Sequence, residues 1–131
     1  MPVTVGMKGR AETVVTPENT AAAVGSGLVS VFATPYMVAL MENAAVNAVQ
    51  PAMEENQGTV GTVLNITHDA ATPIGMKVWA EAEVTAVEGR KITLSVRAFD
   101  ECGPIGSGTH ERFVITVDRF LAKAQAKKAE G

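Results

Sequence analysis

A single carboxylate interrupts the apolar stretch FATPYMVALMEN at residues 32–43. In a helix, which advances about 100° per residue, Glu42 lies beside Val38 and Ala45 and not on the polar stripe of that helix. A carboxylate among apolar side chains is costly unless it is paired or used, and neutralising it would then cost little stability. Glu42 is therefore a candidate nucleophile or general base. The alternative is a structural glutamate at the edge of the stripe that reaches water.

A histidine is the second candidate, at the end of the strand predicted over residues 59–68. Alternation along this strand defines a face that should point to the core, and His68 is in register with it. The other members of this face are Val60, Leu64 and Ile66. A lone histidine on an apolar face is more often structural than catalytic. The intrinsic pKa of a histidine nevertheless lies near neutrality, and Thr34 adds a hydroxyl at the start of the Glu42 helix.

The helix that carries Glu42 is predicted from Pro35 to about Met53, with an interruption near Pro51. Threonine caps free N–H groups and proline suits the first helical position, so Thr34-Pro35 is a good helix start. The polar stripe on one side of the helix consists of one residue and those four, seven and eleven positions after it. They are Asn43, Asn47, Gln50 and Glu54.

Strand patterns fill most of the remaining chain. We expect a short strand within residues 1–18, a small-residue connection over 19–33, and strands at 59–68, 76–87, 91–99 and 106–118. A hairpin turn should centre on Glu88-Gly89, and residues 119–131 should form a helical tail. The 131 residues thus predict one α+β domain, with an antiparallel curved sheet of about five strands wrapped around one long helix. A single helix cannot cover the whole sheet, so we expect a homodimer or a dimer of dimers.

Composition excludes several classes of function. The net charge of −3 does not resemble the basic footprint of a nucleic-acid-binding protein. The uncharged run at residues 20–41 contains glycines and Pro35, so we expect no membrane span. Cys102 is the one cysteine and cannot form an internal disulfide, which favours a reducing compartment and a cytoplasmic protein. No cluster of ligands indicates a metal site.

Four segments together carry a family resemblance: VFATPYMVALMENAAV, GTVGTVLNITHDAATPIG, VEGRKITLSVRAFDE and IGSGTHERFVI. They closely resemble the fluoroacetyl-CoA thioesterases of the hot-dog fold, from about Val31 to Lys123. This resemblance implies a homodimer in which each sheet wraps a central helix, with active sites near the interface. It also implies a catalytic set of Thr34, Glu42 and His68.

The resemblance associates two further residues with the site, Gly61 and Arg112. Gly61 would let substrate approach the backbone closely, although a bend in the sheet explains a glycine equally well. Arg112 shares a strand face with His110, and Glu111 points the other way. From the residues alone, a structural ion pair for Arg112 is narrowly favoured over a contact with substrate.

One segment departs from the family pattern. The family carries phenylalanines before VFAT that form a hydrophobic lid over the small acyl group, whereas this chain has VGSGLVS, with Gly25 and Leu28 at those places. Leu28 and Phe32 are then the expected contacts on the acyl side. We expect a wider, less shielded pocket without strong selectivity for fluoroacetyl-CoA.

These residues predict hydrolysis of a small or medium acyl-CoA thioester to the free acid and coenzyme A. Coenzyme A is part of the substrate, so no separate cofactor is expected. Glu42 would either attack the carbonyl and form an anhydride, or activate water as a general base. Two alternatives remain, an enoyl-thioester hydratase and a non-catalytic acyl-CoA binding protein. The chain lacks a hydratase-type Asp–His motif.

Overall fold

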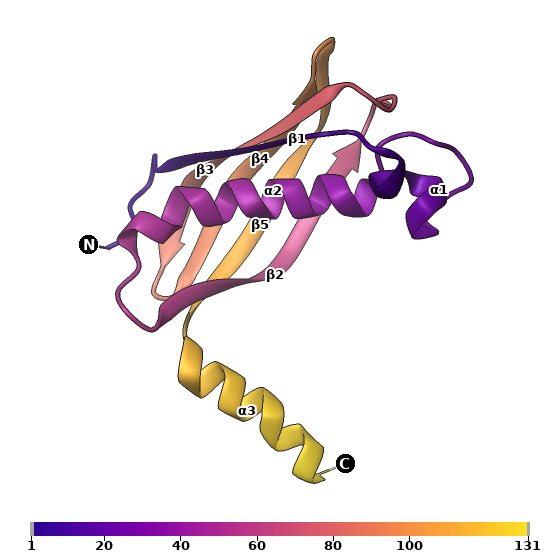
Figure 1. Cartoon of the computed structure of the whole chain (residues 1–131). Coiled ribbons are helices and arrows are strands. Elements are labelled where there is room, and N and C mark those ends of the chain that lie inside the picture. Colours follow the sequence, from indigo (N-terminus) through magenta and orange to yellow (C-terminus); the bar gives the residue numbers. More distant parts are fainter. Residues whose placement is uncertain (1, 131) are drawn as a thin grey trace.

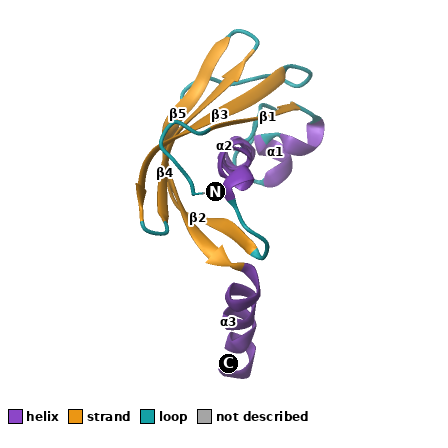
Figure 2. Cartoon of the chain, turned by 90° about the vertical axis from the view of Figure 1, so that its left-hand side faces the viewer, coloured by secondary structure: helices purple, strands orange, loops and turns teal. Residues whose placement is uncertain are grey.

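The computed structural model describes residues 2–130 and folds them into a curved sheet around one long helix (Figures 1 and 2). The sheet is antiparallel, with the strand order β1-β3-β4-β5-β2. Its strands are β1 (Lys8–Val14), β2 (Gln57–His68), β3 (Lys77–Glu88), β4 (Lys91–Asp100) and β5 (Gly103–Thr116). The predicted α+β class, with five strands and one long helix, is confirmed.

Helix α2 (Thr34–Val49) lies across the concave face of the sheet, and the 3₁₀ turn η2 (Gln50–Ala52) follows where Pro51 removes a backbone donor. The helix packs mainly against β1 and β3 and much less against β2. Gly9 allows this closeness, because a Cβ there would clash with backbone atoms of Ala44 and Ala48. The concave face near β5 and β2 is therefore reached only by long side chains of the helix.

Strand β2 is an edge strand that pairs with β5 alone within residues 2–130. A β-bulge between Gly61 and Val63 shifts its alternation by one residue. Before the bulge, the odd-numbered residues Thr59 and Gly61 face the helix, and Val60 lies opposite Phe113 on the outer face. The prediction that Val60 faces the core with Leu64 and Ile66 is therefore wrong, because periodicity does not reveal a bulge.

Three local predictions also differ from the structure. Thr34 does not cap α2: Ala33 is the N-cap residue, and Thr34 already belongs to the first turn. The connection over 19–33 contains the one-turn helix α1 (Ala21–Val24), which follows the 3₁₀ turn η1 (Pro17–Asn19). The β3–β4 turn centres on Gly89 and Arg90, because Glu88 pairs with Lys91 and Gly89 supplies the positive φ of +60°.

The C-terminal helix α3 (Val117–Glu130) stands away from the sheet and contacts mainly the end of β5 (Figure 1). The helix begins at Val117, within the range 106–118 that was predicted as a strand. The last residue of the predicted tail, 131, lies outside the described residues.

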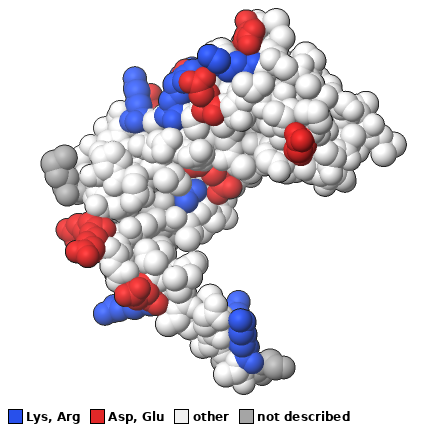
Figure 3. All heavy atoms as spheres, viewed as in Figure 1, with Lys and Arg blue, Asp and Glu red and all other residues white. Residues whose placement is uncertain are grey.

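Charged side chains are unevenly distributed over the face seen in Figure 3. Basic side chains gather on α3, and both acidic and basic side chains follow the opposite rim, whereas much of the face between them is uncharged. Among the described residues, no helix is long and apolar enough to cross a membrane.

Candidate active site

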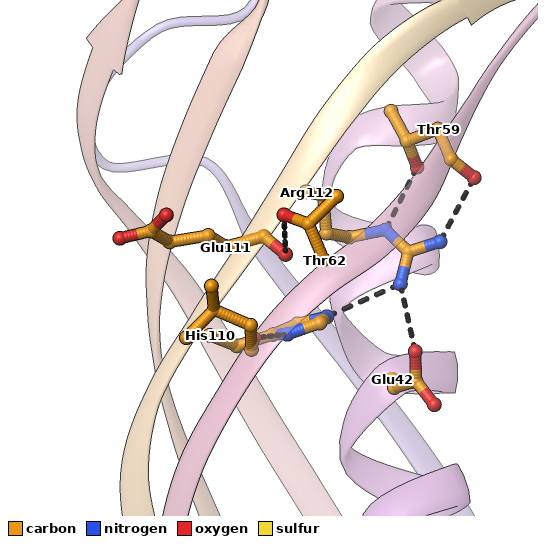
Figure 4. A network of polar contacts seen from close by, with 7 residues as sticks. Glu42, Thr59, Thr62, His110, Glu111 and Arg112 are labelled. Carbon is orange, nitrogen blue, oxygen red and sulfur yellow. Dashed lines mark hydrogen bonds and ion pairs between the residues drawn. The ribbon is translucent and has the colours of Figure 1, made fainter.

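Glu42 reaches from the third turn of α2 to an arginine on β5. Its Oε2 lies 3.3 Å from Nη1 of Arg112, and the two side chains differ greatly in exposure, 41% for Glu42 and 6% for Arg112 (Figure 4). The predicted burial of the Glu42 charge is therefore wrong. The helix leaves the β5 side of the concave face uncovered, so the carboxylate stays accessible while it neutralises a buried cation.

Arg112 is held on three sides. Nε donates to Thr59 Oγ1 at 2.8 Å, Nη2 donates to the Thr59 carbonyl at 2.9 Å, and Nη1 donates to His110 Nε2 at 3.1 Å. Burial lowers the pKa of Arg112 from its usual value, and the nearby Glu42 carboxylate acts in the opposite direction. A guanidinium fixed in this way presents one N–H group to Glu42 in a defined direction.

Gly61 supplies the space that this ion pair occupies. A Cβ at this position would clash with Glu42 Oε2 and would lie 3.1 Å from His110 Cε1 and 3.3 Å from Arg112 Nη1. The backbone of β2 thus closely approaches three polar side chains. Position 61 requires a glycine because the Glu42 carboxylate occupies the space that a side chain at this position would fill.

Thr34 and His68 form a second polar contact, at the N-terminal end of the helix. Thr34 Oγ1 and His68 Nδ1 lie 2.7 Å apart. Burial lowers the pKa of His68, an effect opposed in part by the Ala70 backbone and by Asp69. Nε2 of His68 is buried and has no hydrogen-bond partner among the described residues. Burial therefore favours the neutral ring, which is the form able to accept a proton.

The three predicted catalytic residues are not all in contact within one chain. Thr34 and Glu42 are eight residues apart on α2, which at about 1.5 Å per residue is roughly 12 Å along the axis. The structure brings Thr34 to His68 and Glu42 to Arg112, as two separate groups. Within residues 2–130, no hydrogen bond joins the two groups.

Of the two remaining predicted residues, Phe32 lies near the Thr34–His68 pair and Leu28 does not line the same hollow. A hollow of about 270 Å³ is lined by both residues and by Phe32, whose side chain is 1% exposed and belongs mainly to the core. Leu28 is 98% exposed, on the loop after α1, and is not among the residues that line the hollow. Gly25 has a φ of +77° as the C-cap of α1, a conformation that disfavours a phenylalanine there.

Sequence reasoning missed Thr59 and underrated His110. Thr59 shows no signal in the sequence, because the bulge that aims it at Arg112 is not visible there. His110 could have been found from its shared strand face with Arg112, two residues away on β5. Among the described residues, no group of three or more His, Cys, Asp or Glu side chains could hold a metal ion.

Comparison with known proteins identifies the family of this chain. The model of the family described as FlK, fluoroacetyl-CoA-specific thioesterase, matches residues 15–118. The chain belongs to this family. The fluoroacetyl-CoA thioesterase of Streptantibioticus cattleyicolor is 48% identical over 101 residues, which cover 77% of this chain and 73% of that relative.

Solved structures place the FlK family fold over almost the whole chain. A structure of the fluoroacetyl-CoA thioesterase FlK has a TM-score of 0.91 at 41% identity and covers 97% of this chain and 98% of its own. A thioesterase superfamily member from Thermus thermophilus has a TM-score of 0.90 at 32% identity, with 98% and 96% coverage. The predicted hot-dog fold is confirmed.

Proposed function

We propose that this protein hydrolyses small or medium acyl-CoA thioesters to the free acid and coenzyme A, with Thr34, Glu42 and His68 as the reacting set. One observation carries the proposal. The buried Arg112 holds one oxygen of an accessible carboxylate, and the other oxygen, Oε1, makes no hydrogen bond within residues 2–130. This leaves Glu42 oriented and able to react.

Relatives support the substrate class. FlK is named as a fluoroacetyl-CoA thioesterase, and one solved variant of that enzyme holds fluoroacetate and CoA. That structure covers 90% of this chain with a TM-score of 0.84. Because the chain belongs to the same family, acyl-CoA is the substrate class we assign to it. Water is the only other reactant, so the proposed reaction uses no separate cofactor.

The chemistry begins at the free oxygen of Glu42. As a general base, Oε1 takes a proton from water while the resulting hydroxide attacks the thioester carbonyl. As a nucleophile, Oε1 attacks the carbonyl itself, the coenzyme A thiolate leaves, and water then hydrolyses the anhydride. Both routes give the acid and coenzyme A, and both need the carboxylate that Arg112 orients.

The Thr34–His68 pair provides the proton for the leaving thiolate. In the general-base route, the proton that Glu42 takes from water passes to a neutral His68, which delivers it to the leaving sulfur; in the anhydride route, His68 takes this proton from solvent. The Thr34 hydroxyl fixes the ring through Nδ1. Helix α2 begins beside this pair, and the N–H groups of its first turn have no acceptors within the helix. These N–H groups suit the oxyanion of the tetrahedral intermediate.

A homodimer would unite the two groups in one site. Gly61 lies as far before the Leu64–Asn65 bond as His68 lies after it, on the edge strand β2. Antiparallel pairing of two β2 strands about this bond therefore places Gly61, with Glu42, opposite the partner's His68. The unpartnered Nε2 of His68 and the free oxygen of Glu42 would then form a hydrogen bond with each other or with a shared substrate.

The compartment we propose for this dimer is the cytoplasm. The one cysteine, Cys102, is exposed and free, which fits a reducing compartment.

Thiol release across a panel of acyl-CoAs tests the function. We expect stoichiometric release of coenzyme A from small and medium acyl chains. Loss of enoyl absorbance without thiol release would instead identify a hydratase. Binding of acyl-CoA without turnover would identify a non-catalytic binding protein, and either result would contradict the proposal.

Selectivity should differ from that of a fluoroacetyl-CoA-specific enzyme. Gly25 and the fully exposed Leu28 provide no aromatic cover over the hollow beside Thr34. We therefore expect kcat/KM for fluoroacetyl-CoA and acetyl-CoA to agree within about tenfold. This factor corresponds to a difference of roughly 1.4 kcal/mol in binding free energy. A preference of several orders of magnitude would show that another element provides the lid.

A further inference from the structure

His110 lies at the centre of the Glu42–Arg112 group, and no step of the proposed reaction uses it. Its side chain is 1% exposed, on β5 opposite Leu64 of β2. Nδ1 lies 2.7 Å from the Val63 carbonyl, which can only accept, so Nδ1 carries the proton. Nε2 of the neutral ring is then an acceptor and receives a hydrogen bond from Arg112 Nη1 at 3.1 Å. The contacts therefore fix the tautomer of His110.

Burial supports the neutral ring. The pKa of His110 is lowered first by burial and further by the charge of Arg112, while the Val63 carbonyl and Glu42 act in the opposite direction. The charged groups that face the ring are thus Arg112 on its own strand and Glu42 on α2 (Figure 4). Protonation would turn Nε2 into a donor that opposes the guanidinium.

The hydrogens of Arg112 Nη1 explain why an acceptor at this position matters. Nη1 carries two N–H groups, and in the structure one points to His110 Nε2 and the other to Glu42 Oε2 at 3.3 Å. Nε and one of the two N–H groups of Nη2 donate to Thr59, which leaves the second N–H group of Nη2 free. Arginine and carboxylate side chains otherwise favour a bidentate pair in which both carboxylate oxygens accept.

We propose that His110 is a positioning residue whose Nε2 restricts Arg112 to a single contact with Glu42, leaving the other carboxylate oxygen free to react. The inference rests on the proposed function. Without this acceptor, Nη1 is free to shift toward Glu42, and an N–H of Nη1 together with the free N–H of Nη2 engages both carboxylate oxygens. The carboxylate then becomes a weaker base and a weaker nucleophile.

Two amide substitutions separate positioning from structural support. In His110→Gln, the side-chain oxygen can occupy the place of Nε2 and accept from Arg112, but the donor to Val63 is lost. In His110→Asn, the amide nitrogen can replace Nδ1 and donate to Val63, but the acceptor is lost. Each variant therefore keeps one of the two hydrogen bonds of the histidine and loses the other.

The kinetics of the two variants should differ. We expect His110→Gln to keep kcat within about threefold, and His110→Asn to lose about 10- to 100-fold in kcat with little change in KM. The acidic limb of kcat/KM against pH should also move to lower pH in His110→Asn. If Asn retains activity and Gln does not, His110 serves the bulge at Val63 and the proposal is wrong. Equal losses in both variants would likewise overturn it.

A measurement on the wild-type protein avoids any failure of the variants to fold. Nitrogen-15 NMR of the histidine rings should show His110 as the neutral Nδ1–H tautomer at pH 7, with Nε2 accepting a hydrogen bond. An Nε2–H tautomer or a doubly protonated ring would overturn the proposal. Absence of thioester hydrolysis by a wild-type protein with the expected tautomer would contradict the proposed function and leave the Arg112 arrangement intact.

Discussion

Replacing Glu42 by glutamine should lower kcat for thioester hydrolysis by about 10²- to 10⁴-fold, the usual effect of removing a general base. Loss of a nucleophile would cost more. Glutamine keeps the length of the side chain, and its amide oxygen still accepts from Arg112 Nη1. What is removed is the second ionised oxygen, on which both catalytic routes depend. Turnover per folded molecule, measured by thiol release with acetyl-CoA, gives the result.

Glu111→Gln is the matched control for this substitution. Glu111 lies between His110 and Arg112 on β5, and strand alternation points it away from the site. The control changes the net charge equally and should leave kcat within about twofold, because surface charges act weakly at such sites. If Glu42→Gln hydrolyses thioesters at the wild-type rate, Glu42 is structural and the assignments of Thr34 and His68 lose their support.

Glu42→Gln should also destabilise the fold. Arg112 is 6% exposed, and the substitution leaves a buried cation without its carboxylate. Because Glu42 is 41% exposed and the contact is 3.3 Å long, we expect a loss of only about 1 kcal/mol, or roughly 3 °C in Tm. The apolar neighbours of Glu42 in the sequence predicted no such loss. The structure reverses that prediction, since the buried charge belongs to Arg112.

A dimer that combines a Glu42→Gln chain with a His68→Ala chain should recover about half of the wild-type activity, whereas each variant alone is nearly inactive. In a site shared between protomers, such a heterodimer holds one intact site, made from the unaltered Glu42 of one chain and the unaltered His68 of the other. Tandem purification with two different tags isolates this heterodimer. Thiol release per dimer then measures the recovery.

The reciprocal arrangement provides the control. A chain with both substitutions, paired with a wild-type chain, should be nearly inactive, because each shared site then carries one lesion. If each protomer holds its own complete site, this second heterodimer keeps about half of the activity and the first keeps almost none. That reversal would exclude the shared site. A monomer in sedimentation at micromolar concentration would exclude the dimer itself.

The sequence by itself determined the elements and the candidate residues. Hydrophobic periods of 3.6 and 2 are local properties of the chain, so the long helix and the strands could be predicted to within a few residues. Glu42 stood out because its charge breaks an apolar helix face, and His68 because it ends an apolar strand face. The sequence also paired Arg112 with His110 on one strand face, a consequence of alternation alone.

Only the tertiary structure decided which of these residues meet. The partner of Glu42 is Arg112, 70 residues away in sequence, and the partner of Thr34 is His68, 34 residues away. The bulge at Gly61–Val63 turned Thr59 toward Arg112, and no period in the sequence encodes that shift. Long-range pairing depends on how all the elements pack together, and for that reason local pattern identified the reactive side chains without revealing their partners.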